Sequence, residues 1–301
     1  MEFTTLGLKV YTFSMRTRVS WHITLSLLMT LCLVNVFGQS DGEETRITPM
    51  NFSGSVGKYK KLEVGLILPA TIGNKIDLFL NGQSTGGINP FDPAQINIEA
   101  IFTSVEDGKS HIIYGFYYRE FRPERAELDT WKAQRTVYPW RIRFAPDALG
   151  EWTCSIRIKV PTLDIEMDFR DCVEITCVAS DNPGYLEVGL DRRHLRFSDT
   201  RSSFFAIGQN IAWPIEIAEN WETGRVSANS FVRYRKAVEN LAKNSGNYFR
   251  LAMATWGHAI EWEELGNYQS RLSHAWELDK IFEISEANSV YVLLCLEMQN
   301  A

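Results

Sequence analysis

Residues 58–180 carry short runs in which apolar and polar side chains alternate, separated by turn residues. Residues 96–102 read Ile-Asn-Ile-Glu-Ala-Ile-Phe and residues 140–144 read Trp-Arg-Ile-Arg-Phe, which is the period of a half-buried strand. Similar runs occupy residues 62–68, 112–121, 152–158 and 168–178. The spacing predicts about seven strands and no helix, arranged as an antiparallel, immunoglobulin-like β-sandwich.

The pattern changes after residues 181–184, Asp-Asn-Pro-Gly. Residues 185–197 predict a hairpin that turns at residues 191–193. Beyond it, three apolar runs at residues 204–208, 248–253 and 290–296 alternate with two segments of helical period. The first of these segments places Phe231, Tyr234, Val238 and Leu241 on one face, and the second places Ala275, Leu278, Phe282 and Ser285 on one face. Apolar strands that alternate with helices indicate a parallel α/β sheet.

An apolar run from Ile23 to Phe37 follows Arg16 and Arg18 near the N-terminus. The run has about 15 residues, whereas a membrane-spanning helix needs roughly 20. A short apolar run behind basic residues is typical of a secretion signal.

We therefore predict a signal peptide over residues 1–38, with Met15 as an alternative start, and a polar leader over residues 39–57. An uncleaved membrane anchor is the alternative. Export predicts a secreted or periplasmic protein without stable membrane insertion after cleavage.

The net charge of −6 argues against nucleic acid as the main partner. Nine Trp and eleven Tyr either fill a core or stack on sugars. No Cys/His spacing suggests zinc, so we expect no metal and no cofactor. Both Cys154 and Cys177 are predicted to face the core, where either a bridge between them or free buried thiols would fit.

Two sets of segments resemble a known family. Residues 89–93, 115–118, 143–147 and 150–152 resemble the N-terminal β-sandwich called the domain of unknown function 5060 (DUF5060). Residues 204–210, 247–250, 262–268 and 290–296 resemble the start of the (β/α)8 TIM barrel that follows it in secreted glycoside hydrolases of the cellulase-like clan A. The resemblance implies a sandwich over residues 58–180 and the first part of a barrel over residues 184–301.

Arg250 matches the clan's Arg at the end of the second strand, which holds the nucleophilic carboxylate. A guanidinium there would favour the ionised carboxylate. The alternative for Arg250 is a structural ion pair at the strand end.

Further substrate-binding candidates follow the three strands. Asn210 and Trp213 follow the first strand, Trp256 and His258 the second, and Glu297 and Asn300 the third. All are expected on the barrel face where active sites form. Each Trp would either stack on a sugar or pack its loop, and we interpret Glu297 as a substrate contact rather than an acid or base. Three further glutamates, Glu261, Glu263 and Glu264, suggest a solvated charge cluster.

The resemblance places the acid/base and nucleophilic glutamates of a retaining mechanism after the fourth and seventh strands. The sequence supplies three strands and ends at Ala301, so the two glutamates are expected beyond Ala301. We therefore expect no catalytic residue in this chain, which would be a fragment that is inactive alone.

The predicted function is the N-terminal portion of a secreted hydrolase acting on O-glycosidic bonds of a polysaccharide or oligosaccharide. The alternative is a sugar-binding or purely structural accessory sandwich. The candidate rings of such a sandwich are Tyr114, Tyr117, Tyr118, Trp131 and Tyr138.

Overall fold

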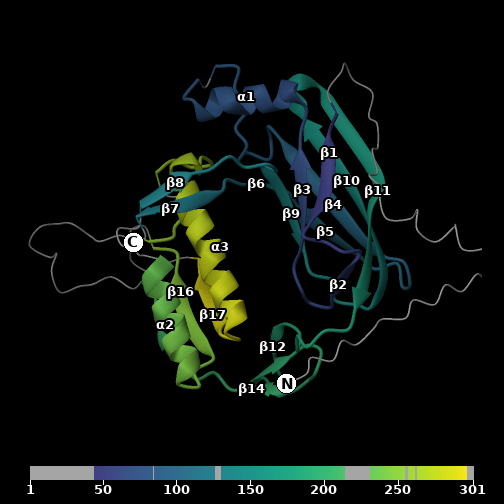
Figure 1. The fold of residues 1–301 in the computed structure, drawn as a ribbon. Helices are drawn as coiled ribbons and strands as arrows, with labels where there is room; N and C mark the ends of the chain where they lie inside the picture. Colours follow the sequence, from purple (N-terminus) through teal and green to yellow (C-terminus); the bar gives the residue numbers. More distant parts are fainter. Residues whose placement is uncertain are drawn as a thin grey trace, which may run out of the picture. The chain divides into compact units, whose positions relative to one another are not determined.

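A computed structural model describes residues 44–83, 85–125, 130–213, 231–254, 257–261 and 263–296. The predicted signal peptide and the first part of the predicted leader lie outside these residues. The described chain is rich in β-structure, with several sheets and few helices (Figure 1). No helix within it is long and apolar enough to cross a membrane.

Two sheets form the first half of the described chain. The four-stranded sheet has the order β1 (Arg46–Met50), β3 (Leu62–Ile67), β9 (Trp140–Phe144), β6 (Phe116–Tyr117). The five-stranded sheet has the order β2 (Ser55–Gly57), β11 (Ile165–Val178), β10 (Gly150–Val160), β4 (Asn97–Ser104), β5 (Ser110–Tyr114). All neighbours are antiparallel except β2 and β11, which are parallel.

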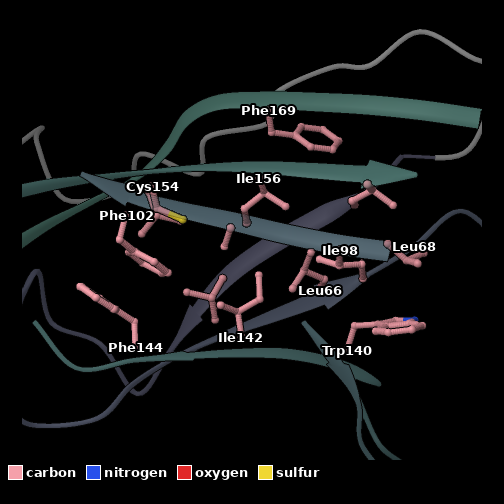
Figure 2. Close-up of a cluster of buried hydrophobic side chains, with 14 of the residues drawn as sticks. Leu66, Leu68, Ile98, Phe102, Trp140, Ile142, Phe144, Cys154, Ile156 and Phe169 are labelled. Carbon is pink, nitrogen blue, oxygen red and sulfur yellow. The ribbon is translucent and has the colours of Figure 1, made fainter. Parts of the chain in front are cut away.

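One apolar core joins the inner faces of the two sheets. Burial alternates along β4 and β10 as the sequence pattern requires. Figure 2 shows Phe102 and Ile156 of one sheet pointing toward Phe144 and Ile142 of the other. The rings of Phe102 and Phe144 stack with their centroids 4.0 Å apart. The predicted strands at residues 96–102, 140–144 and 152–158 are therefore confirmed.

The expectation of no helix before residue 180 is wrong. The helix α1 covers Ala70–Leu80, with Ile72 and Ile76 buried on one face. The four-residue spacing of these two side chains matches one helical face, but Gly73 and Asn74 between them weaken the helical signal. The strands β1 and β2 were also not anticipated, because they lie in the segment interpreted as a polar leader.

The predicted run at residues 112–121 is three strands rather than one. It divides into β5, β6 and β7 (Phe121–Arg125), the last of which pairs with β8 (Thr130–Ala133). The chain passes from one sheet to the other at Gly115, where an added Cβ would lie 2.8 Å from Ile98. Only a residue without a side chain fits this crossing.

The predicted hairpin is confirmed as β12 (Leu186–Val188) and β13 (Leu195–Phe197), and β14 (Ser203–Phe204) adds a third antiparallel strand. The single buried strand expected at residues 204–208 is wrong. Phe204 is buried, but Phe205 and Ile207 are 80% and 51% exposed. A separate strand, β15 (Gly208–Asn210), begins after them.

Three parallel strands close the described chain, in the order β15, β16 (Tyr248–Ala252), β17 (Tyr291–Cys295). Between them run α2 (Phe231–Lys243), a short 3-10 turn at Gln269–Arg271 and α3 (Leu272–Ala287). The predicted parallel α/β arrangement is confirmed for these elements. A second apolar core joins α2 and α3 to β16, and its members lie between residues 211 and 294.

The predicted face of α2 is confirmed, since Tyr234, Val238 and Leu241 are buried. The predicted face of α3 is only partly right. Leu278 and Ser285 are buried, but Phe282 is 37% exposed, and Trp276 is buried instead. Trp276 packs against Trp131 of β8, with ring centroids 4.7 Å apart, a contact that helical periodicity does not reveal.

The four cysteines of the described chain are free thiols, so the Cys154–Cys177 bridge is absent. The thiol of Cys172 donates to the carbonyl oxygen of Cys154 at 3.3 Å. The neighbouring Cys172 thiol and burial together raise the pKa of Cys154.

Candidate functional site

The parallel sheet has one face covered by helices and one face that carries polar side chains. Phe249 and Leu251 of β16 are fully buried in the core shared with α2 and α3. Because successive side chains of a strand point to opposite faces, Tyr248 and Arg250 point away from the helices. Asn210 of β15 is the register partner of Arg250, and Leu293 of β17 is its partner on the other side. Asn210, expected after the first strand, is the last residue of β15, and it and Arg250 are neighbours on one face. That this face binds a substrate stays a prediction.

Arg250 is exposed and donates from Nε to the Sγ atom of Cys295 at 3.0 Å. This contact joins β16 to β17 and holds the Nε end of the guanidinium in place. Among the residues that the structure describes, no carboxylate forms an ion pair with Arg250. The structural ion pair that was the alternative interpretation of Arg250 is thus not found there.

The segment after β15 is held by a buried contact from α2. The hydroxyl of Tyr234 donates to the carbonyl oxygen of Ala212 at 3.0 Å, and burial raises the pKa of Tyr234 well above its usual value. Trp213, the next residue, is half-buried. Helix α2 therefore positions the residues that immediately follow Asn210.

His258 does not lie on the polar face with Arg250. Its side chain is 1% exposed and contacts the two helices instead. The Nε2 atom lies 3.3 Å from the Glu277 carboxylate of α3, and the ring centroid lies 5.4 Å from that of Tyr234. Glu277 also accepts a hydrogen bond from the indole of Trp131. His258 is thus part of a buried polar cluster and is not placed to touch a substrate.

Two further polar residues support this buried cluster. Arg271 donates to the carbonyl oxygens of Ala259 at 2.8 Å and Gly257 at 2.7 Å, which holds the loop that carries His258. Burial, with Arg271 and His258 nearby, lowers the pKa of His274 to about 4. Sequence reasoning missed the cluster, although Glu277 inside the apolar face of α3 was a signal that could have indicated it.

Three predicted site residues, Trp256, Glu297 and Asn300, lie outside the described residues. Ala301, beyond which the two catalytic glutamates were expected, lies outside them as well. The structure therefore does not test the expectation that the catalytic pair follows Ala301, and that expectation stays a prediction. Within the described ranges, no three His, Cys, Asp or Glu side chains are grouped to hold a metal ion.

Glu261, Glu263 and Glu264 are exposed, as predicted for a solvated cluster. The Glu261 carboxylate accepts from the backbone of Gly266 at 2.6 Å, and Glu264 accepts from Asn267 at 2.8 Å. Both carboxylates therefore support a local turn.

Of the five rings proposed for a sugar-binding sandwich, only Tyr114 is well exposed, at 61%. Tyr118 is buried beneath Arg141, whose guanidinium carbon lies 3.7 Å from the ring centroid. Tyr117 packs edge-on against Trp140. Tyr138 covers Gly65 so closely that an added Cβ would lie 2.6 Å from its ring, and Trp131 packs against Trp276 as described above. Four of the five rings are therefore used in packing.

Comparison with known proteins identifies one domain. Residues 73–159 match the family described as "Domain of unknown function (DUF5060)", so the chain contains a DUF5060 domain. The matched range includes all four segments on which the resemblance to this domain rested, and that part of the prediction is confirmed. No curated protein matches the chain.

Solved structures show only distant likeness. A candidate glycoside hydrolase from Bacteroides vulgatus ATCC 8482 aligns with 80% of the chain at 13% identity and a TM-score of 0.46, and the alignment spans 41% of that protein. The β-glucuronidase of Parabacteroides merdae aligns with 77% of the chain and 20% of its own length, at 9% identity and a TM-score of 0.22. The ASH/PapD-like domain of human CEP192 aligns over 50% of the chain and 97% of its own length, at 11% identity and a TM-score of 0.16.

Proposed function

We propose that this protein is a relative of secreted glycoside hydrolases, and that the face carrying Asn210 and Arg250 binds a polysaccharide. The observation that carries the proposal is the pairing of these two side chains on neighbouring parallel strands, on the face that α2 and α3 leave open. The DUF5060 domain ahead of the strands supports it, because the sequence resemblance places that domain in front of a hydrolase barrel. In this proposal β15, β16 and β17 are the first strands of a (β/α)8 barrel, and the two sheets before them are an immunoglobulin-like sandwich.

The chemistry of the face suits a sugar or a carboxylate. A guanidinium and a carboxamide offer several hydrogen-bond donors in fixed directions, which hydroxyl and carboxylate oxygens accept. A retaining hydrolase needs two carboxyl groups about 5–5.5 Å apart. The strand residues on this face, in the part of the chain described, include no Asp or Glu. We therefore propose that this face binds a saccharide. We propose cleavage of the glycosidic bond by a retaining mechanism for the full-length members of the family.

The proposed location is outside the cytoplasm, either secreted or periplasmic. The support is the basic and apolar pattern of residues 1–38. Export would bring the protein to the polysaccharides that lie outside cells. No cofactor is proposed for this chemistry.

A second candidate function is saccharide binding by the sandwich itself. One observation favours it: Ile112 and Tyr114 of β5 are 56% and 61% exposed on the same side of the strand. An exposed aromatic ring beside an aliphatic side chain is an amphipathic surface on which a sugar ring can stack.

Affinity electrophoresis of the full chain in gels that contain xylan, mixed-linkage β-glucan, galactomannan or arabinan tests the two candidates. We expect Arg250→Gln to weaken retardation by at least one polysaccharide about tenfold, because a charge-assisted hydrogen bond is lost. The matched control is Arg170→Gln, an exposed arginine of β11, which should change nothing. Loss of retardation in Tyr114→Ala but not in Arg250→Gln would instead assign binding to the sandwich.

A further inference from the structure

Two cavities adjoin at Tyr185, near the amino ends of β16 and β17. One has a volume of about 800 Å³ and includes Tyr248 and Tyr291, the first residues of β16 and β17. The other has a volume of about 340 Å³ and includes His111 and Asp147. Lys61, Ala145 and Tyr185 line both, so the two form neighbouring parts of one depression, which we call the Tyr185 groove. The groove reaches Leu293, the register partner of Arg250, but it includes β16 and β17 chiefly at their amino ends, whereas barrel active sites form at the carboxyl ends of strands.

Several aromatic rings line the Tyr185 groove beside aliphatic side chains. Tyr185 is 55% exposed and packs edge-on against Tyr59, with centroids 5.0 Å apart and an interplanar angle of 83°. This contact holds the Tyr185 ring in place while leaving much of it open to solvent. Tyr248 and Tyr291 are half-buried in the larger cavity. Ordered tyrosines present an apolar face together with a hydroxyl, which is what the alternating C–H and O–H surface of a sugar contacts.

Most charged side chains of the groove have ion-pair partners. Lys60 pairs with Asp181 at 3.3 Å, and Lys61 pairs with Glu283 at 3.8 Å. Asp147 pairs with Lys109 at 2.5 Å and lies 3.2 Å from His111. Burial raises the pKa of Asp147, but these two neighbours outweigh it and the pKa is lowered, so the carboxylate stays ionised.

Arg143, which lines the smaller cavity, is paired in the same way with Glu63 and Asp279. Of the charged residues that line the two cavities, only Glu286 has no ion-pair partner within the described residues. An anionic ligand would have to displace the carboxylate partner of a lysine or arginine, whereas the hydroxyl groups of a neutral sugar can form hydrogen bonds with the paired side chains as they stand. The groove therefore suits an uncharged ligand.

We propose that the Tyr185 groove is a non-catalytic binding site for a neutral saccharide chain, with the ring of Tyr185 as its stacking platform. The class of ligand rests on the proposed function, and the location rests on the cavities and their lining. Because Tyr185 lines both cavities, sugar units bound in the two would share contact with its ring. Such a site would hold the polysaccharide to the protein beside the Arg250 face, toward the amino ends of the strands.

Isothermal titration calorimetry of the full chain with neutral cello-, xylo- and manno-oligosaccharides tests this proposal, with oligogalacturonate as the charged probe. We expect the unchanged chain to bind a neutral oligosaccharide, Tyr185→Leu to weaken this binding at least tenfold, and Tyr185→Phe to retain it. Leu preserves apolar packing against Tyr59 without a ring, and thermal unfolding checks that the variant is folded. The matched control is Phe205→Leu, which removes an aromatic ring that is 80% exposed and lines neither cavity.

The variants separate the groove from the proposed active face. Binding lost in Tyr185→Leu and kept in Arg250→Gln supports the groove and counts against saccharide binding at Arg250. Binding lost only in Arg250→Gln overturns the groove and leaves the proposed function standing. Two binding events, each removed by one variant, support both sites. The groove is also overturned if the unchanged chain binds no neutral probe or prefers oligogalacturonate.

Discussion

Arg143 contacts two carboxylates that belong to different elements. Its Nε donates to Glu63 of β3 at 2.6 Å, and its two terminal nitrogens donate to Asp279 of α3 at 2.7 and 2.6 Å. Burial lowers the pKa of Arg143, but the two carboxylates outweigh it and raise the pKa. A bidentate pair of this kind, partly shielded from water, is stronger than an exposed pair.

Replacing Asp279 should therefore destabilise the protein measurably. We expect Asp279→Asn to lower the free energy of unfolding by about 1–3 kcal/mol, because the guanidinium loses a charged partner. Asp168→Asn is the control, since its partner Arg170 is 85% exposed, and it should cost under about 0.5 kcal/mol. Urea unfolding followed by tryptophan fluorescence gives both values. Equal costs for the two variants would contradict the role of Arg143.

His274 should make stability depend on pH in a defined window. Burial is the main cause that lowers its pKa to about 4, below the ordinary value of 6.5. The unfolded chain therefore binds a proton at a higher pH than the folded chain does, and stability is full above pH 6.5 and falls as the pH is lowered toward 4. We expect His274→Gln to flatten this slope between pH 6.5 and 4, measured as the urea midpoint. An unchanged slope would exclude His274 as its source.

At the scale of elements, strict alternation of apolar and polar residues predicted the strands correctly. Strands β4, β9 and β10 each have one face in a shared core, so their period of two was legible in the sequence. The strand ends within residues 112–121 could not be read in this way. The chain passes between the two sheets at Gly115, where it packs closely against Ile98 of another strand. Helix α1 was missed for a local reason, since glycine and asparagine in its interior weaken its propensity.

Two glycines should respond in opposite ways to the same substitution. Gly115→Ala would place a Cβ 2.8 Å from Ile98 in the core, which we expect to cost about 1–3 kcal/mol. Gly73→Ala lies in α1 with nothing within 4 Å of the added Cβ. It should be neutral or stabilise by up to about 1 kcal/mol. Thermal unfolding of the two variants compares them directly, and a destabilised Gly73→Ala would contradict the helix.

At the scale of the whole molecule, the described chain has two separate apolar cores. The first includes residues between 47 and 177, and the second includes residues between 211 and 294. The sequence period changes after residues 181–184, between the two cores, and a domain boundary there stays a prediction. Polar contacts such as Arg143–Asp279 and Trp131–Glu277 could not be predicted from the sequence, because they join residues that are far apart in it.

Because the first core is complete within its own residues, the segment 44–183 should fold alone. We expect a β-type circular dichroism spectrum and a single cooperative unfolding transition for this segment. A disordered spectrum would mean that the first core depends on α3 and the strands that follow.

The positions of candidate site residues were predictable only where the backbone geometry of a strand determines the direction of the side chain. Arg250 and Asn210 point to one face because they occupy paired positions on neighbouring strands. His258 follows the same strand, but it lies in a loop whose path is set by Arg271 and Glu277, so its burial could not be read from its position. The Tyr185 groove likewise depends on residues brought together from distant parts of the sequence.

The central claim is that a saccharide binds the face formed by β15 and β16. Hydrogen–deuterium exchange of the full chain, with and without a saturating neutral oligosaccharide that binds it, tests this claim most directly. We expect slower exchange in peptides that cover residues 208–213 and 248–254, and in residues 59–61 and 185–186 if the groove is also filled. Protection confined to residues 110–114, or no protection at all, would contradict the claim.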